Sequence, residues 1–127
     1  MTDGIDATAN ESTETRRALA ACGRLPGVEL TFPFGVETSV FKVGGRMFAA
    51  MAADEMPASI TLKCDPDHGA ALMRKYSEII PGYHMNKRHW ITVSLRPTLP
   101  PKLVDDLVTN SYELVVSGLP ARSRPAP

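Results

Sequence analysis

The feature of the sequence that most constrains the fold is a glycine pair between two strand-like segments. Gly44 and Gly45 separate residues 38–43 from residues 46–51. Glycine adopts positive φ angles without a steric penalty, and the two-residue turn of a tight β-hairpin needs such angles. The sequence therefore predicts an antiparallel hairpin over residues 38–51.

A two-residue turn also determines which side chains face each other across this hairpin. Phe41 is expected to face Phe48, which would form an aromatic cross-strand pair on one face. Lys42 is expected to face Met47 on the other face. The two faces are therefore expected to differ, with the aromatic pair on one and a base on the other.

Two further segments alternate between apolar and polar residues, which is typical of half-buried antiparallel strands. Residues 59–64 place Thr61 and Lys63 on the face opposite the apolar positions. Residues 89–95 likewise place Trp90 opposite an aliphatic face. Both segments are predicted to be strands with one face toward the core.

Three helices are predicted, over residues 12–23, 65–76 and 98–117. The second opens with an Asp-Pro pair, a common helix start. The third has an apolar stripe at helical spacing, and Thr98 is expected to be its N-cap. A proline or glycine near each end agrees with these boundaries.

The remaining segments complete the expected order of elements. Residues 29–32 are predicted to be a short strand, and residues 77–88, which contain a Pro-Gly pair, are predicted to be a loop. The order is then helix, three or four strands, helix, strand, helix. Strands that follow one another directly favour an α+β fold, an antiparallel sheet of about four to five strands with helices packed on one face.

The composition excludes several classes of protein. The 127 residues contain 14 Lys and Arg against 14 Asp and Glu, so the formal net charge is zero and gives no global attraction to nucleic acid or anionic membranes. No apolar run approaches the roughly 20 residues of a membrane span, and the first residues lack the basic and apolar regions of a signal peptide. We expect a cytoplasmic protein without membrane association.

The chain is predicted to have one domain, residues 12–120, between a flexible acidic leader, 1–11, and a flexible tail, 121–127.

Residues 83–90 concentrate two histidines, an amide, two bases and two aromatic side chains. Bases interleaved with aromatic rings suit nucleic acid, because cations contact phosphates and rings stack on bases. The hairpin carries further bases near its turn. The candidate nucleic-acid-binding residues are Lys42, Arg46, His84, Asn86, Lys87, Arg88, His89 and Trp90.

Two other interpretations fit the same residues. A protein or small ligand could be bound by the same loop and sheet face, an alternative that the zero net charge favours. The residues could also be structural, with Asn86 capping a turn, Lys87 and Arg88 solvated, and Trp90 covered by a loop or helix. The sequence leaves these alternatives open.

The sequence offers no complete catalytic or metal-binding set. Cys64 lies on the apolar face of its predicted strand, which indicates a small buried hydrophobe. His84 and His89 are five residues apart and lack the further ligands of a metal site. No paired carboxylates or glycine-rich phosphate loop are present. We expect a non-enzymatic protein with no cofactor and no metal, either a monomer or a weak homodimer.

Several segments are similar to the MmcQ/YjbR family. They are TFPFG (31–35), VFKVGGRMFA (40–49), LKCDP (62–66), IIPGYHMNKRHWITV (79–93), LP (99–100) and SYELVVSGLP (111–120). The resemblance spans about residues 13–120 and implies a compact, CyaY-like α+β fold. It also implies a DNA-binding role through a double-wing surface, with the hairpin as one wing. The first predicted helix combines Glu14 with Arg16 and Arg17, so the acidic ridge of frataxin-like iron binding is not expected.

Overall fold

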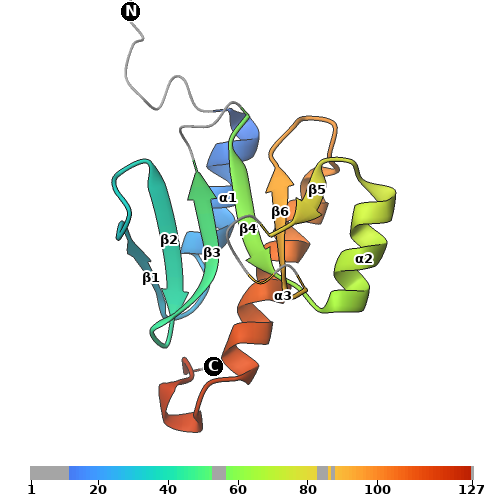
Figure 1. The fold of residues 1–127 in the computed structure, drawn as a ribbon. Coiled ribbons are helices and arrows are strands. Elements are labelled where there is room, and N and C mark those ends of the chain that lie inside the picture. Colours follow the sequence, from blue (N-terminus) through green and yellow to red (C-terminus); the bar gives the residue numbers. More distant parts are fainter. Residues whose placement is uncertain (1–11, 53–56, 83–85, 87, 127) are drawn as a thin grey trace, which may run out of the picture.

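The computed structural model describes residues 12–52, 57–82, 86 and 88–126 of the chain. Three α-helices, six strands and a short 3₁₀ helix follow one another along these residues (Figure 1). In chain order they are α1 (Thr13–Gly23), β1 (Val28–Thr31), β2 (Thr38–Val43), β3 (Arg46–Ala52), β4 (Ser59–Lys63), α2 (Pro66–Lys75), β5 (Ile79–Pro81), β6 (Trp90–Ser94), α3 (Pro101–Ser117) and η2 (Ala121–Ser123). The predicted α+β class is confirmed.

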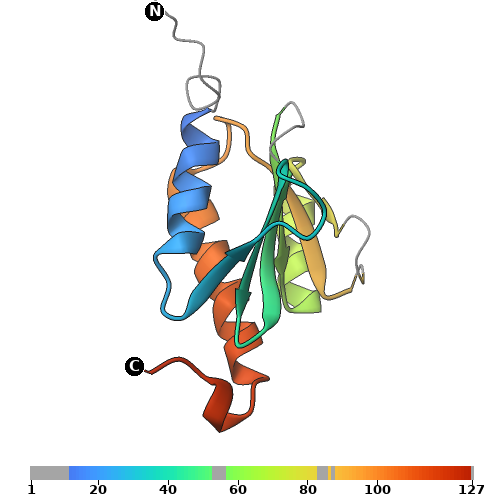
Figure 2. The ribbon, with the colours of Figure 1, turned by 90° about the vertical axis from the view of Figure 1, so that its left-hand side faces the viewer.

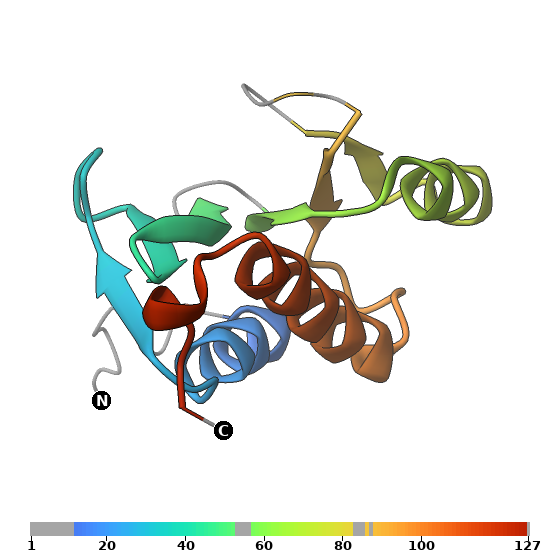
Figure 3. The same cartoon turned by 90° about the horizontal axis from the view of Figure 1, so that it is seen from below.

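The strands form one antiparallel sheet in the order β1-β2-β3-β4-β6-β5. α1 and α3 lie side by side against one face of this sheet (Figure 2 and Figure 3). α2 lies beside β5, the strand at one edge of the sheet. The opposite face is turned toward the viewer in Figure 1, and none of the described helices covers it. We call it the open face. None of the helices in the described residues is long and apolar enough to cross a membrane.

Side-chain hydrogen bonds cap the start of α1 and join α1 to α3. Ser12 is the N-cap that the sequence predicts, and its hydroxyl accepts a hydrogen bond from the Thr15 N–H at 3.0 Å. Arg17 of α1 donates to the Asp105 carboxylate of α3, with Nη2 and Oδ2 2.6 Å apart. The pair is partly exposed, so solvent screens it and its contribution to stability is small.

The pairing of β4 with β6 places the two alternating segments next to each other. The positions that face the helices are Ile60, Leu62, Ile91 and Val93, each at most 2% exposed. The positions on the open face are Thr61, Lys63, Trp90 and Thr92, and the two threonine hydroxyls are 2.9 Å apart. The predicted alternation is confirmed on both strands, and it gives the molecule one apolar and one polar sheet face.

The hairpin between β2 and β3 has the predicted turn, and both turn glycines have positive φ, 58° and 80°. Lys42 faces Met47 as expected. The predicted pairing of Phe41 with Phe48 is wrong by one residue, because the register shifts between Phe41 and Lys42 and Phe41 pairs with Ala49. A β-bulge sets two residues of one strand against one of the other. The two phenylalanine rings still meet, with centroids 6.4 Å apart.

The sheet has six strands, where about four to five were expected. The loop predicted over residues 77–88 is wrong at its start, where Ile79–Pro81 form β5 at the edge of the sheet. Proline cannot donate to a ladder and is tolerated at an edge. The Pro-Gly pair therefore ends a short edge strand.

The start of α3 also differs from the prediction. Thr98 does not cap this helix, because the helix begins at Pro101 and Pro100 occupies the N-cap position. The fixed φ of proline suits a first helical turn, which places the boundary at the proline pair. The Thr98 hydroxyl instead donates to the Glu78 carboxylate at 2.5 Å.

Part of the tail that was expected to be flexible has regular structure, although residues 121–124 are exposed. Residues 121–123 form η2 after the buried Leu119. The Arg124 guanidinium donates to the carbonyls of Leu119 at 3.1 Å and Ser117 at 3.2 Å. These carbonyls at the end of α3 have no partner within the helix, which explains why a cation binds them. The expected leader, 1–11, lies outside the described residues.

Candidate functional site

Several of the predicted site residues lie at the lower end of the sheet in Figure 1, where the β2–β3 turn, the end of β4 and the start of β6 come together. A depression of about 320 Å³ opens there. It is lined by Arg46, Met47, Lys63 and Trp90 of the sheet and by Leu114, Val115 and Gly118 of α3. We call it the basic depression. The sequence had singled out two of its residues, Arg46 and Trp90.

Lys63 was missed as a site residue, although its place on the polar face of an alternating strand was a usable signal. Lys63 pairs with Trp90 across β4 and β6, and both side chains are half-buried. The chain between them includes α2 and β5, so their adjacency does not follow from sequence spacing. Met47 joins them on the next strand, because β3 pairs with β4.

Trp90 is held closely by the edge strand. The Gly82 N–H donates to the Trp90 carbonyl at 2.7 Å. A Cβ atom at Gly82 would lie 2.5 Å from the Trp90 Cβ, which no real contact allows. Only glycine therefore fits beside Trp90, and the backbone of the tryptophan is fixed from this side.

The two hairpin bases have different surroundings. Lys42 is half-buried on the open face, opposite Met47. Arg46 reaches the helical layer, where its Nη1 donates to the Gly118 carbonyl at 3.3 Å. The C-terminal end of a helix carries partial negative charge, so this contact stabilises α3 as well as placing a cation at the site.

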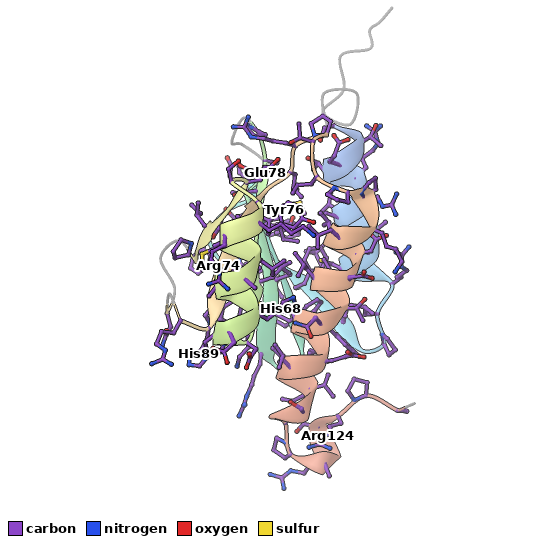
Figure 4. The ribbon with its side chains drawn as sticks, turned by 90° about the vertical axis from the view of Figure 1, so that its right-hand side faces the viewer. His68, Arg74, Tyr76, Glu78, His89 and Arg124 are labelled. Atoms are coloured by element: carbon purple, nitrogen blue, oxygen red, sulfur yellow. The ribbon has the colours of Figure 1, made fainter. Side chains whose placement is uncertain are left out.

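The segment before β6 is organised around Asn86. Its side-chain oxygen accepts from the Arg88 N–H at 3.0 Å, and its carbonyl accepts from the His89 N–H at 3.1 Å. Asn86 therefore caps a turn, which confirms the structural interpretation of this residue. Arg88 and His89 are exposed, and Figure 4 shows His89 near the lower end of α2. His84 and Lys87 lie outside the described residues.

The cations of this region are available to a ligand. Within the described residues, the ion pairs are Arg17–Asp105 and Lys102–Asp106, and both involve the helical layer. No carboxylate in the described part of the chain lies within ion-pair distance of Lys42, Lys63 or Arg88. An anion could therefore bind these cations without displacing the carboxylate of Asp or Glu from the part of the chain that the structure describes.

A buried hydroxyl sets the geometry beneath the basic depression. The β3–β4 ladder ends at the pair of Ala49 and Leu62. Beyond it, the fully buried Ser111 of α3 donates to the Phe48 carbonyl at 2.6 Å and accepts from the Lys63 N–H at 2.8 Å. The sequence showed Ser111 only as a small residue on an apolar stripe. In the structure, the Ser111 hydroxyl joins β3 and β4 where the two strands no longer pair directly.

Cys64 is not an activated nucleophile. Cys64 Sγ lies 3.6 Å from His68 Nδ1, but the thiol is buried. Burial, and to a smaller extent the nearby Asp65 carboxylate, raise the pKa of Cys64, so the neutral thiol dominates near pH 7. Among the described residues, no three His, Cys, Asp or Glu side chains group in a way that could hold a metal ion.

Comparison with known proteins identifies the family. The model of the YjbR family matches residues 23–114. The chain belongs to the YjbR family. The uncharacterized protein YbdF of Escherichia coli O157:H7 is 42% identical over 111 residues, which are 87% of this chain and 89% of YbdF. The uncharacterized protein YjbR of Escherichia coli K12 is 32% identical over 106 residues, 84% of this chain and 90% of YjbR.

Two solved structures share the fold of this family member. A Deinococcus radiodurans protein with a DUF419 domain superposes with a TM-score of 0.79 at 39% identity, over 89% of this chain and 85% of that one. A Pseudomonas syringae protein superposes with a TM-score of 0.65 at 26% identity, over 81% and 97% of the two chains. The MmcQ/YjbR resemblance is thereby confirmed, and the CyaY-like label stays a prediction.

Proposed function

We propose that this protein is a non-enzymatic nucleic-acid-binding protein that uses the basic depression and residues 86–90. The observation that carries the proposal is that Arg46, Lys63 and Trp90 line one depression. Lysine and arginine contact phosphates, and an indole ring stacks on a base regardless of its identity. The combination suits a backbone contact next to a stacked base.

The spacing of the cations supports a contact with more than one phosphate. Lys42 lies on β2, Lys63 on β4 and Trp90 on β6, at the same end of the sheet. Neighbouring strands are about 4.8 Å apart, so the three positions span on the order of 15 Å. Arg46 uses one donor on α3 and keeps others, because a guanidinium has five N–H groups.

A titration of fluorescently labelled short duplex and single-stranded DNA, followed by anisotropy at low and physiological salt, tests this proposal. The site variant is Lys63→Ala/Arg88→Ala. The matched control is Arg74→Ala/Lys102→Ala, which removes the same charge from exposed positions on α2 and α3. Thermal unfolding of each variant shows whether it is folded.

Binding should weaken steeply with salt, because each neutralised phosphate contributes about 0.9 to the slope of log K against log salt on duplex DNA. We expect the site variant to reduce this slope by about 1.8 and the control to leave it unchanged. Undetectable binding at low salt, or equal losses in both double variants, would refute the proposed site. Trp90 is the only tryptophan, so quenching of its emission reports stacking directly.

A protein partner on the same surface is the second candidate. Asp65 precedes α2 and Asp67 lies in its first turn, immediately after Lys63 along the chain, so the lower end carries both signs of charge. Mixed charge around a central tryptophan is typical of protein interfaces. Trp90→Ala should then remove a specific partner from a pull-down without lowering DNA affinity, and an unchanged set of partners would refute this alternative.

A further inference from the structure

A second depression lies at the other end of the open face. Its volume is about 490 Å³, and β5, the end of β6 and the segment before α3 bound it. Figure 4 shows Glu78 near the upper end of α2 and His89 near its lower end. The lining residues used in the argument are Glu78, Ile80, Thr92, Ser94, Arg96 and Thr98. We call it the upper pocket.

The upper pocket holds two opposite charges that do not pair with each other. The Thr98 hydroxyl donates to the Glu78 carboxylate at 2.5 Å. This bond and a backbone hydrogen bond at Glu78 itself lower the pKa of Glu78, and the positive charge of Arg96 adds a smaller effect, so the carboxylate is ionised at neutral pH. No ion pair within 4 Å joins Arg96 to Glu78, and the described ion pairs lie elsewhere.

The backbone holds both charged residues in one network. The Ser94 N–H donates to the Glu78 carbonyl at 2.9 Å, and the Arg96 N–H donates to the Ser94 carbonyl at 2.9 Å. The Leu99 N–H in turn donates to the Arg96 carbonyl at 3.1 Å. The backbone that carries both charged residues is therefore fixed at the end of β6, and a ligand can bind without ordering this segment.

The remaining lining is polar, with one apolar side. Thr92 and Ser94 supply hydroxyl groups from β6. Ile80 of β5 is 49% exposed and faces Thr92 across the ladder, so it offers an apolar contact surface. The lining residues include no aromatic ring, which disfavours stacking of a sugar or base in this pocket.

We propose that the upper pocket binds a small zwitterion of the free α-amino acid class. Its ammonium group would meet the Glu78 carboxylate, its carboxylate would meet the Arg96 guanidinium, and its side chain would lie toward Ile80. A ligand with a single charge would leave one of these two groups without an opposite charge. This site is separate from the basic depression, because the length of β6, about 13 Å from Trp90 to Ser94, lies between them.

The test is a ¹H–¹⁵N correlation titration of the full chain with L-leucine and L-serine, and with methylammonium and acetate as single-charge probes. Each probe is raised to roughly 20 mM, so that even a dissociation constant of about 1 mM approaches saturation. The variants are Glu78→Gln and Arg96→Gln. Matched controls are Glu113→Gln and Arg74→Gln, which change the same charges at exposed positions on α3 and α2.

The proposal requires saturable shifts of the Glu78, Ile80, Ser94 and Arg96 amides with an amino acid. Each pocket variant should weaken that binding at least tenfold, and both controls should leave it unchanged. Leucine should bind more tightly than serine because of the contact with Ile80. The proposal is overturned if methylammonium or acetate alone binds as tightly, if the shifts map to other residues, or if no probe gives saturable shifts.

Discussion

Replacing Ser111 by alanine removes the hydroxyl that joins β3 to β4 below the basic depression. The hydroxyl donates to the Phe48 carbonyl at 2.6 Å and accepts from the Lys63 N–H at 2.8 Å. Ser111 is fully buried, so solvent does not reach either backbone group from the position of the lost oxygen. Ser111→Ala leaves one buried acceptor and one buried donor without this partner.

The expected magnitude follows from those two groups. Leaving a buried polar group unsatisfied costs about 1–3 kcal/mol. Alanine has a higher helix propensity than serine, which offsets up to about 0.5 kcal/mol of this loss in stability. The free energy of unfolding should therefore fall by about 1.5–6 kcal/mol, a large part of the roughly 5–15 kcal/mol of an ordinary domain. The midpoint of thermal unfolding should fall by about 4 °C per kcal/mol.

Chemical denaturation followed by Trp90 fluorescence and by circular dichroism measures this loss. The matched control is Ser117→Ala on the same helix, where the hydroxyl is exposed and donates to the Leu114 carbonyl at 2.8 Å. That change should stay within about 0.5 kcal/mol. If Ser111→Ala also stayed within that range, or if both variants lost the same free energy, the bridge would not stabilise the fold as argued.

Three further predictions concern other parts of the molecule. Tyr112→Phe removes the hydrogen bond from the Tyr112 hydroxyl to the Pro26 carbonyl, 2.5 Å long, and urea denaturation should show a loss of about 1 kcal/mol. Gly82→Ala places a Cβ 2.5 Å from the Trp90 Cβ, so a lower unfolding midpoint together with an altered emission of Trp90 is expected, and an unchanged spectrum would contradict the contact. The pKa of Glu78 is lowered in the folded protein, so its contribution to stability is complete above the unfolded pKa of about 4.3 and is lost as the pH falls through the lower folded value. Glu78→Gln should therefore reduce the loss of thermal stability between neutral pH and about pH 3, and parallel pH profiles for the two proteins would contradict this.

The candidate site was only partly predictable from the sequence. Arg46 and Trp90 were recognisable because a hairpin turn and a run of bases and aromatics are local features. Lys63 carried a weaker signal, since one lysine on the polar face of a strand is common. The bridge through Ser111 had no sequence signal, because a serine on an apolar helical stripe reveals nothing about which backbone groups lie opposite it.

The sequence by itself determined the apolar and polar faces of two strands and the position of the hairpin turn. Alternation in the segments that became β4 and β6 predicted which face of each strand is apolar, because side chains alternate across any strand. The glycine pair predicted the hairpin, because few other residues adopt its backbone angles. These patterns depend only on residues that are close together in the sequence, so they can be recognised without the tertiary structure.

The tertiary structure decided which strands lie next to each other and where their register shifts. β4 and β6 are neighbours although α2 and β5 separate them in the chain, and this order brings Lys63 beside Trp90. The bulge beside Phe41 and the edge strand β5 likewise depend on contacts between distant segments. Such contacts form only when the helices and the sheet pack into a common core, since burial of apolar surface from the whole chain selects the pairing.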